Sequence, residues 1–302
     1  MKRPTRAHAK LMRGWVGQHV IAPNTRFRVQ RWRITAPAWG ARAPIRIGIL
    51  SDLHWGYRPV TPRLLAAVKQ RLQALAPDLI VFLGDLSEGP TNAAKRQNGA
   101  AGAQAMSGLF APLGTYAILG NHDWHDARDA QERRAGPVAA AIELEKAGFH
   151  VLQNTALRTA RDDFWLAGLD SQQAFKGETG EPKHVGADDL EATLSHVSGD
   201  DPVILLAHEP DIFPDIKDPR VAVVLSGHMH AGQIRPFGRA LYAPSKHGTR
   251  YAYGHYENAG RHLIVSGGLG CSTIPLRIGI TPEITVVEIQ GHGPTHEHFP
   301  PR

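Results

Sequence analysis

Side chains that commonly bind metal ions follow five separate apolar segments of this 302-residue chain. They occur as Asp52-x-His54, Asp85, Asn121-His122-Asp123, His208 and His228-x-His230. The set offers carboxylate, amide and imidazole ligands but no thiolate, which suits Mn²⁺, Fe or Zn and not copper(I) or an iron–sulfur cluster. We expect two divalent ions, with Mn²⁺ as the first choice. Two such ions roughly 3.5–4 Å apart lower the pKa of a shared water and orient a phosphoryl group. The chemistry indicated is therefore hydrolysis of a phosphoester.

The spacing within these groups predicts how the ligands are presented. Asp52 and His54 are two residues apart, as are His228 and His230, and in extended chain such side chains share one face. We therefore expect each pair to grip a metal from one edge. Asp85 can bridge two ions, because each of its carboxylate oxygens offers lone pairs to a different ion.

The apolar segments themselves predict the strands that position these ligands. They are short, rich in β-branched residues and continuously apolar, as strands buried on both faces are, and they cover residues 45–50, 79–83, 116–119, 203–207 and 221–225. Helical patterns alternate with them at 62–76, 93–110, 129–147 and 187–197. Ligand crevices in open α/β sheets lie at the carboxyl ends of strands. We therefore predict one site in one α/β catalytic domain, residues 45–290, with 171–187 as a surface loop at its mouth.

The five groups, read in order, resemble the motif set of the calcineurin-like metallophosphoesterase superfamily: Asp52-x-His54, Gly84-Asp85, Gly120-Asn121-His122-Asp123, His208 and Gly227-His228-Met229-His230. The resemblance implies a four-layer α/β/β/α sandwich. It implies one metal held by Asp52, His54, Asp85 and His230, and a second held by Asp85, Asn121, His208 and His228. It also implies that His122 faces the phosphate, as general acid or as stabiliser of developing charge, and that Asp123 orients its ring.

Departures from the superfamily's branches narrow the expected activity. Protein Ser/Thr phosphatases carry an arginine shortly after the bridging aspartate, and purple acid phosphatases place a tyrosine ligand where this chain has Glu88. The C-terminal third instead resembles the bacterial branch of YkuE, YaeI and a UDP-2,3-diacylglucosamine pyrophosphatase, in residues 228–234, 265–270, 275–277 and 282–284. Ala231 and Glu209 differ from that branch without removing a ligand. Gly268, Gly270 and Pro275 are expected to form loops near the site.

The branch implies a phosphodiesterase or pyrophosphatase, and the leading substrate is lipid-linked, such as the UDP-2,3-diacylglucosamine of lipid A biosynthesis. Two alternatives stay open. One is a soluble phosphodiesterase of cyclic nucleotides or a nuclease, and the other is a non-catalytic, metal-bound interaction module. No obligate protein partner is indicated.

The first 51 residues carry the excess positive charge of the chain. They hold eleven Lys and Arg and no Asp or Glu, whereas the remainder has 23 basic and 28 acidic residues, so the two parts are near +11 and −5. No apolar run of about 18 residues and no signal-type segment is present, which argues against a secretory signal or a transmembrane helix. We therefore expect residues 1–44 to form a basic arm on a protein that faces the cytoplasm.

Part of this arm has the pattern of an amphipathic helix. Apolar residues at 11, 12, 15, 16 and 20 share one helical face, with basic residues nearby, as in helices that lie on an anionic membrane. This predicts peripheral contact with the inner face of the cell membrane. The alternatives are a helix packed on the domain or a disordered arm. Nucleic acid is not expected, because the arm lacks the aromatic interleaving of a base-stacking platform. Residues 291–302 are expected to be a mobile tail.

Overall fold

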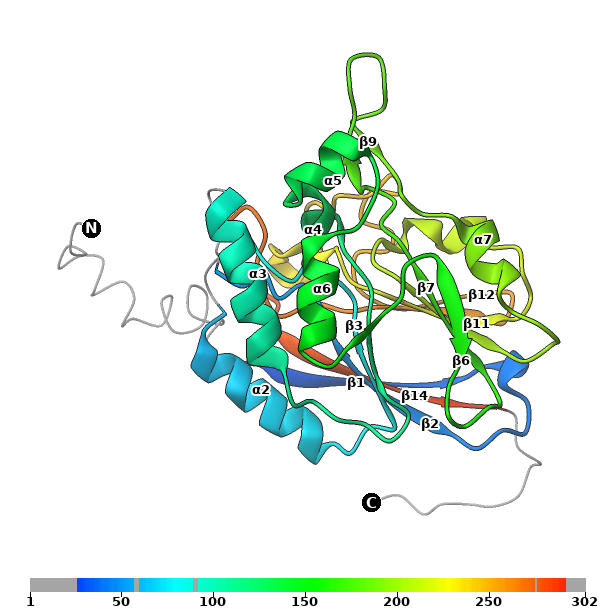
Figure 1. The fold of residues 1–302 in the computed structure, drawn as a ribbon. Helices are drawn as coiled ribbons and strands as arrows, with labels where there is room; N and C mark the ends of the chain where they lie inside the picture. Colours follow the sequence, from blue (N-terminus) through cyan, green and yellow to red (C-terminus); the bar gives the residue numbers. More distant parts are fainter. Residues whose placement is uncertain (1–25, 57–59, 89–91, 275, 292–302) are drawn as a thin grey trace.

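Two six-stranded sheets lie face to face, and helices cover their outer sides (Figure 1). The computed structural model describes residues 26–56, 60–88, 92–274 and 276–291. Three apolar clusters fill the spaces between the layers. Along one strand, Leu79, Val81 and Leu83 belong to the cluster between the sheets, while Ile80 and Phe82 belong to the cluster under the helices. The four-layer α/β/β/α sandwich is confirmed.

The first sheet has the order β1-β14-β2-β3-β4-β5. Its strands are β1 (Arg28–Thr35), β14 (Glu283–Gln290), β2 (Ile45–Leu50), β3 (Leu79–Phe82), β4 (Thr115–Ala117) and β5 (His150–Val151). Strands β2 to β5 are parallel, and β14 runs antiparallel to β2 but parallel to β1. The outer helices are α2 (Pro62–Ala74), α3 (Asn92–Met106), α4 (Asn121–His125), α5 (Arg128–Arg133) and α6 (Ala139–Lys146).

The second sheet has the order β12-β13-β11-β10-β7-β6. Its strands are β12 (Gly254–Asn258), β13 (Arg261–Val265), β11 (Val221–Ser226), β10 (Val203–Ala207), β7 (Trp165–Leu169) and β6 (Thr155–Arg158). The four inner strands are parallel, and the two edges are antiparallel. Helix α7 (Leu190–Ser195) and the 3-10 helix η4 (Pro210–Asp215) pack outside it. The mouth loop 171–187 holds a small hairpin of β8 (Phe175–Lys176) and β9 (His184–Val185).

The strand predictions agree with the structure within about two residues, whereas one predicted helix is wrong. The single helix expected over 129–147 is two helices, α5 and α6. Arg134 ends α5 in the left-handed conformation, with φ 50°, and Pro137 follows shortly after. Because proline has no N–H and a fixed φ, a helix seldom continues through such a point.

The described part of the basic arm is built into the first sheet. Strand β1 lies within the segment 1–44 and pairs with β14 along its whole length. Arg28 and Arg33 form ion pairs with Glu283 and Glu288, at 2.9 and 3.0 Å, and Arg42 pairs with Asp201. These cations therefore serve contacts within the domain. The amphipathic pattern at 11–20, Pro275 and the tail at 292–302 lie outside the described residues, and no helix within the described residues could span a membrane.

Candidate metal centre

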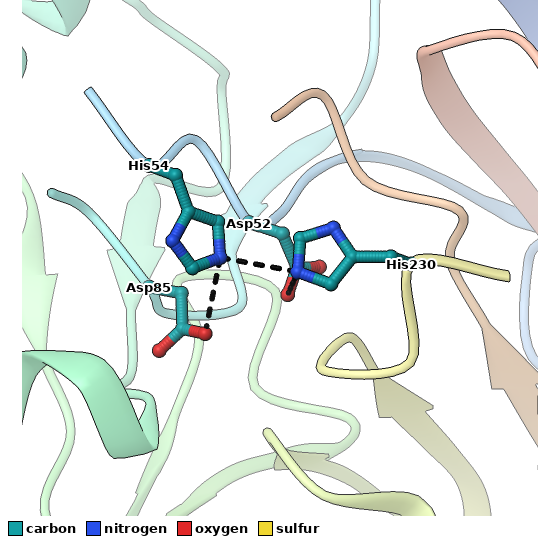
Figure 2. A group of neighbouring side chains, drawn as sticks. All are labelled: Asp52, His54, Asp85 and His230. Carbon is teal, nitrogen blue, oxygen red and sulfur yellow. Dashed lines mark hydrogen bonds and ion pairs between the residues drawn. The ribbon is translucent and has the colours of Figure 1, made fainter. Parts of the chain in front are cut away.

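All seven predicted metal ligands lie at the carboxyl ends of strands and are buried. They follow β2 (Asp52, His54), β3 (Asp85), β4 (Asn121, at the start of α4), β10 (His208) and β11 (His228, His230). The described residues include three groups of potential ligands. Two of them contain Asp85: Asp52, His54, Asp85 and His230 (Figure 2), and Asp85, His208 and His228. The third consists of His54, Glu88 and His122. Within each group the ligand atoms lie within 4.8 Å of one another. Asp85 is the member that the first two groups share.

One oxygen of Asp85 faces both groups. Its Oδ2 lies 3.4 Å from His54 Nε2 and 3.3 Å from His208 Nε2. Its Oδ1 accepts the backbone N–H of His122 at 2.9 Å. The second oxygen is therefore held by the start of α4, and the bridging of two ions by the two oxygens of Asp85 stays a prediction.

The paired ligands are not in extended chain, and that part of the sequence interpretation is wrong. Five of the seven ligands have positive φ: Asp52 at 53°, His54 at 44°, Asp85 at 59°, His228 at 66° and His230 at 47°. Such values are uncommon for residues other than glycine and gather at functional sites, where the surrounding structure holds them in place. The loops that follow the strands thus turn sharply. Asp52 and His54 come together in one ligand group, whereas His228 and His230 fall in different groups, contrary to the expectation that each pair holds one metal.

Two glycines let the loops approach the ligands closely. A Cβ on Gly120 would lie 2.3 Å from Asp85 Oδ1, and a Cβ on Gly227 would lie 2.8 Å from Asp52 Oδ2. Both distances are shorter than real Cβ contacts. The glycines of the motifs therefore make room for the carboxylates.

Three of the ligand histidines have an acceptor beside the nitrogen that points away from the shared centre. His208 Nδ1 lies 2.5 Å from Leu83 O, and His228 Nε2 lies 3.1 Å from Pro244 O. His54 Nδ1 lies 3.1 Å from Glu88 Oε2, as an ion-pair contact outside hydrogen-bond geometry. Acceptors in this position fix the tautomer of a metal-binding histidine and leave its other nitrogen free. Glu88 was not among the predicted site residues.

Beside His230 the neighbouring group is instead a hydrogen-bond donor, the guanidinium of Arg277. Its Nη2 lies 3.3 Å from His230 Nδ1, and the guanidinium also donates to the carbonyl oxygens of Gly267 and Gly270. The side chain is fully buried. The loop that it holds supports the first ligand, because the N–H groups of Leu269 and Gly270 donate to the carbonyl oxygens of Ser51 and Asp52. Sequence reasoning noted Arg277 only as part of a motif and missed this role.

Asp123 does not orient the ring of His122, contrary to the expectation. Its carboxylate accepts three backbone N–H groups, from Asp85, Leu86 and Gly120, each at 2.9 Å. It therefore ties the loop after β3 to the loop after β4. The ring of His122 instead has Ser272 Oγ 3.5 Å from its Nε2.

Burial and mutual charge govern ionisation in the site. Burial lowers the pKa of His228 to about 3, with His208 adding to the shift, and burial also lowers the pKa of His230. Both imidazoles are therefore neutral near pH 7, as metal binding requires. Burial opposes charge on His54 too, but the contacts with Asp85 and Glu88 raise its pKa to about 10. The pKa of Asp85 is held well below its ordinary value despite burial, chiefly by His208 and His122.

A cavity of about 520 Å³ opens above the two ligand groups. His122 and Asn121 line its floor beside the ligands, and the mouth loop contributes Gln173, Lys183 and His184. The expected place of the loop 171–187 is therefore confirmed. The site combines buried ligands with an open face large enough for a substrate.

The donor set fits metal ions. Among the described residues, Asn121 Oδ1 is buried without a hydrogen-bond partner. An unpaired buried amide oxygen is costly, and coordination to a cation would satisfy it. The other donors are carboxylates and imidazoles, which suit divalent ions such as Mn²⁺, Fe²⁺ or Zn²⁺.

Comparison with known proteins agrees with this architecture. The family model described as calcineurin-like phosphoesterase matches residues 45–232, and the chain belongs to this family. It is a metal-dependent hydrolase of phosphoesters, of a family that uses a dinuclear metal site.

Three relatives illustrate the range of the family. The uncharacterized metallophosphoesterase YkuE of Bacillus subtilis is 33% identical over 71% of this chain and 68% of its own length. Phosphodiesterase YaeI of Escherichia coli is 30% identical over 82% of this chain and 83% of its own. A zebrafish (Danio rerio) protein named transmembrane protein with metallophosphoesterase domain is 29% identical over 82% of this chain. The chain spans about half (53%) of the length of that relative.

Proposed function

We propose that the chain hydrolyses a phosphodiester or pyrophosphate bond at a dinuclear centre held by Asp52, His54, Asp85, Asn121, His208, His228 and His230. The observation that carries the proposal is the pair of ligand groups that share Asp85 at the floor of an open cavity. Two divalent ions bound there, Mn²⁺ by first choice, would activate a water and neutralise charge on the phosphoryl oxygens.

The residues around the centre have separate tasks in this proposal. Asp85 joins the two groups, and the acceptors on the far nitrogens hold the imidazoles in place. His122 belongs to neither group that contains Asp85, although it forms a third group with His54 and Glu88, and it lines the cavity together with Ser272. It is therefore placed to protonate the leaving oxygen or to stabilise the charge that develops on it. Asp123 supports the reaction indirectly, by holding the two loops together.

Hydrolysis of bis(p-nitrophenyl) phosphate tests the reaction. The chain is treated with a chelator and then titrated with Mn²⁺, Fe²⁺ or Zn²⁺, and turnover is expected to return as the second equivalent binds. His54→Gln should lose most of this activity. His196→Gln, which changes an exposed histidine after α7, is the matched control and should keep it. Stoichiometric metal binding without turnover of any diester would favour the non-catalytic module.

The substrate that we propose first is lipid-linked, with UDP-2,3-diacylglucosamine as the leading example. Support comes from the similarity to a protein named phosphodiesterase and from the basic N-terminal arm. Turnover should be compared for UDP-2,3-diacylglucosamine, a cyclic nucleotide, a glycerophosphodiester and single-stranded DNA. The highest kcat/KM is expected for the first. A higher value for the cyclic nucleotide or for DNA would replace this substrate by the soluble alternative.

We also propose that the arm brings the domain to an anionic membrane on its cytoplasmic side. Each cation near such a surface contributes up to about 1 kcal/mol, and this attraction weakens as salt screens the charges. Removal of residues 1–22 should therefore weaken sedimentation with anionic vesicles at low salt. Hydrolysis of a soluble diester should survive, because every proposed ligand lies at Asp52 or beyond. Equal sedimentation of the shortened and full chains would exclude this role.

A further inference from the structure

Large apolar side chains are exposed on one side of the cavity mouth. They are Phe237, Leu241, Tyr242 and Ile274, with exposed fractions of 104%, 69%, 72% and 48%. We call these four residues the mouth rim. The described residues contain only two other exposed large apolar side chains, Phe110 and Ile142. Three members of the rim also line the cavity, so the apolar surface continues from the outside into the site.

The rim is anchored to the metal centre by short connections. Two loops carry the rim. The first begins directly after His230 and holds Phe237, Leu241 and Tyr242, and the second holds Ile274. The loops are joined where Ile234 pairs with Ile278. Gln233 Nε2 donates to the carbonyl oxygens of Ser272 and Ile274, at 3.1 and 2.8 Å. The two loops therefore form one structure whose position is fixed relative to the ligands.

The tip of the rim displays an aromatic ring with no packing partner beneath it. Phe237 is the central residue of η6 (Pro236–Gly238), and its φ is 53°. A bulky residue in this conformation is uncommon. Arg235 holds the turn by donating to the carbonyl oxygens of Ala231 and Gly238, at 2.9 and 2.6 Å. The turn thus keeps a phenyl ring fully in solvent, where it gains nothing from burial within this chain.

Basic residues predominate in the segment that carries most of the rim, although one of them, Lys246, is paired with Asp215 at 2.9 Å. Residues 219–256 contain no Asp or Glu, and residues 231–256 contain Arg235, Arg239, Lys246 and Arg250. Lys183 adds a further cation at the cavity wall. Apolar side chains flanked by cations are the combination that binds at the interface of an anionic bilayer, where the rings enter the boundary and the cations meet the head groups.

We propose that the mouth rim inserts into the surface of an anionic lipid bilayer and so places the cavity against the membrane. The inference rests on the proposed function only in assigning a lipid-linked substrate to that site. It adds a contact surface that is separate from the N-terminal arm and that depends on apolar insertion more than on charge.

Vesicle binding by the full chain tests the rim. Vesicles of phosphatidylglycerol and phosphatidylethanolamine are used in about 0.5 M salt, where a Debye length of about 4 Å suppresses the contribution of the arm. Phe237→Ser should lower the partition coefficient about fivefold or more, the order expected for withdrawing one large apolar side chain from the interface. Phe110→Ser is the matched control, because Phe110 is 70% exposed and is not part of the cavity lining. The control should change binding less than twofold.

A second measurement detects the insertion of residue 237 into the bilayer directly. Phe237→Cys and Phe110→Cys are labelled with an environment-sensitive dye, and only the label at 237 should brighten when vesicles are added. The proposal would be overturned if Phe237→Ser bound vesicles as well as the unaltered chain at high salt, or if the dye at position 237 did not brighten with vesicles. If both results were found together, they would point to a protein partner for the rim. Hydrolysis of bis(p-nitrophenyl) phosphate is measured in parallel. If the unaltered chain did not hydrolyse this diester, the proposed function would be refuted. The vesicle assays would still test whether the rim inserts into the bilayer.

Discussion

Replacing Asp123 by asparagine tests whether this residue ties the loop after β3 to the loop after β4 or orients the ring of His122. The carboxylate accepts N–H groups from Asp85 and Gly120 on Oδ2 and from Leu86 on Oδ1. The amide of asparagine has one acceptor, which can keep the first two bonds, while its NH₂ group meets the Leu86 N–H. Losing one charge-assisted hydrogen bond and leaving a buried N–H unpaired costs roughly 3–5 kcal/mol. Removing a buried charge beside Asp85 offsets part of this cost. We expect a net loss of about 2 kcal/mol in the free energy of unfolding.

Urea denaturation at pH 8 measures this loss, with and without Mn²⁺. Asp200→Asn, at an exposed aspartate, is the control and should unfold like the unaltered chain. The metal content of Asp123→Asn should also fall, because the loop that carries Asp85 loses its tie to α4. If Asp123→Asn unfolds within about 0.5 kcal/mol of the unaltered chain, the range of an ordinary surface substitution, our assignment is wrong. A slower reaction with unchanged stability would instead favour the orienting of His122.

Three further outcomes are expected. Asp85→Asn should weaken simultaneous binding of two metal ions, and metal analysis that finds two full equivalents with a normal rate would exclude Asp85 as the shared ligand. His122→Ala should keep its metals and lose roughly 10²–10⁴-fold in rate, with a smaller loss for diesters that have good leaving groups; an unchanged rate on an alkyl diester would remove His122 as general acid. Burial raises the pKa of Asp170 to about 7, so the folded state holds this proton more tightly than the unfolded state, where the pKa is about 3.9. Stability should therefore fall as the pH rises from about 4 to about 7, and thermal unfolding of Asp170→Asn over that range should show a smaller fall.

The strands and the positions of the metal-binding side chains could be predicted because their signals are local. A continuous apolar run such as 203–207 reads as a buried strand, and a polar residue directly after it, such as His208, falls at the strand end. The helix ends were less certain. Asp189 caps α7 by accepting the Ala192 N–H at 2.8 Å, and this starts the helix later than the pattern at 187–197 suggested.

The contacts that join distant segments could not be read from the sequence. Arg277 reaches His230 across 47 residues, and Arg28 meets Glu283 across 255. No periodic pattern marks such a pair, because each partner has the local surroundings of an ordinary surface cation or carboxylate. The left-handed turns at Asp52 and His228 were missed for a related reason. Their conformation is imposed by neighbouring loops rather than preferred by the residues themselves.

The pairing of β1 with β14 has a consequence for the order in which the molecule can be completed during synthesis. Strand β14 (Glu283–Gln290) separates β1 from β2, so the first sheet lacks an inner strand until β14 has been synthesised. The segment that precedes β14 supplies Arg277 and the loop against Asp52. A nascent chain can therefore present most of the metal-binding side chains while an apolar sheet edge is still open, and open edges of this kind favour misassembly. Productive loading with metal is thus expected only after β14 has been synthesised and has joined the sheet.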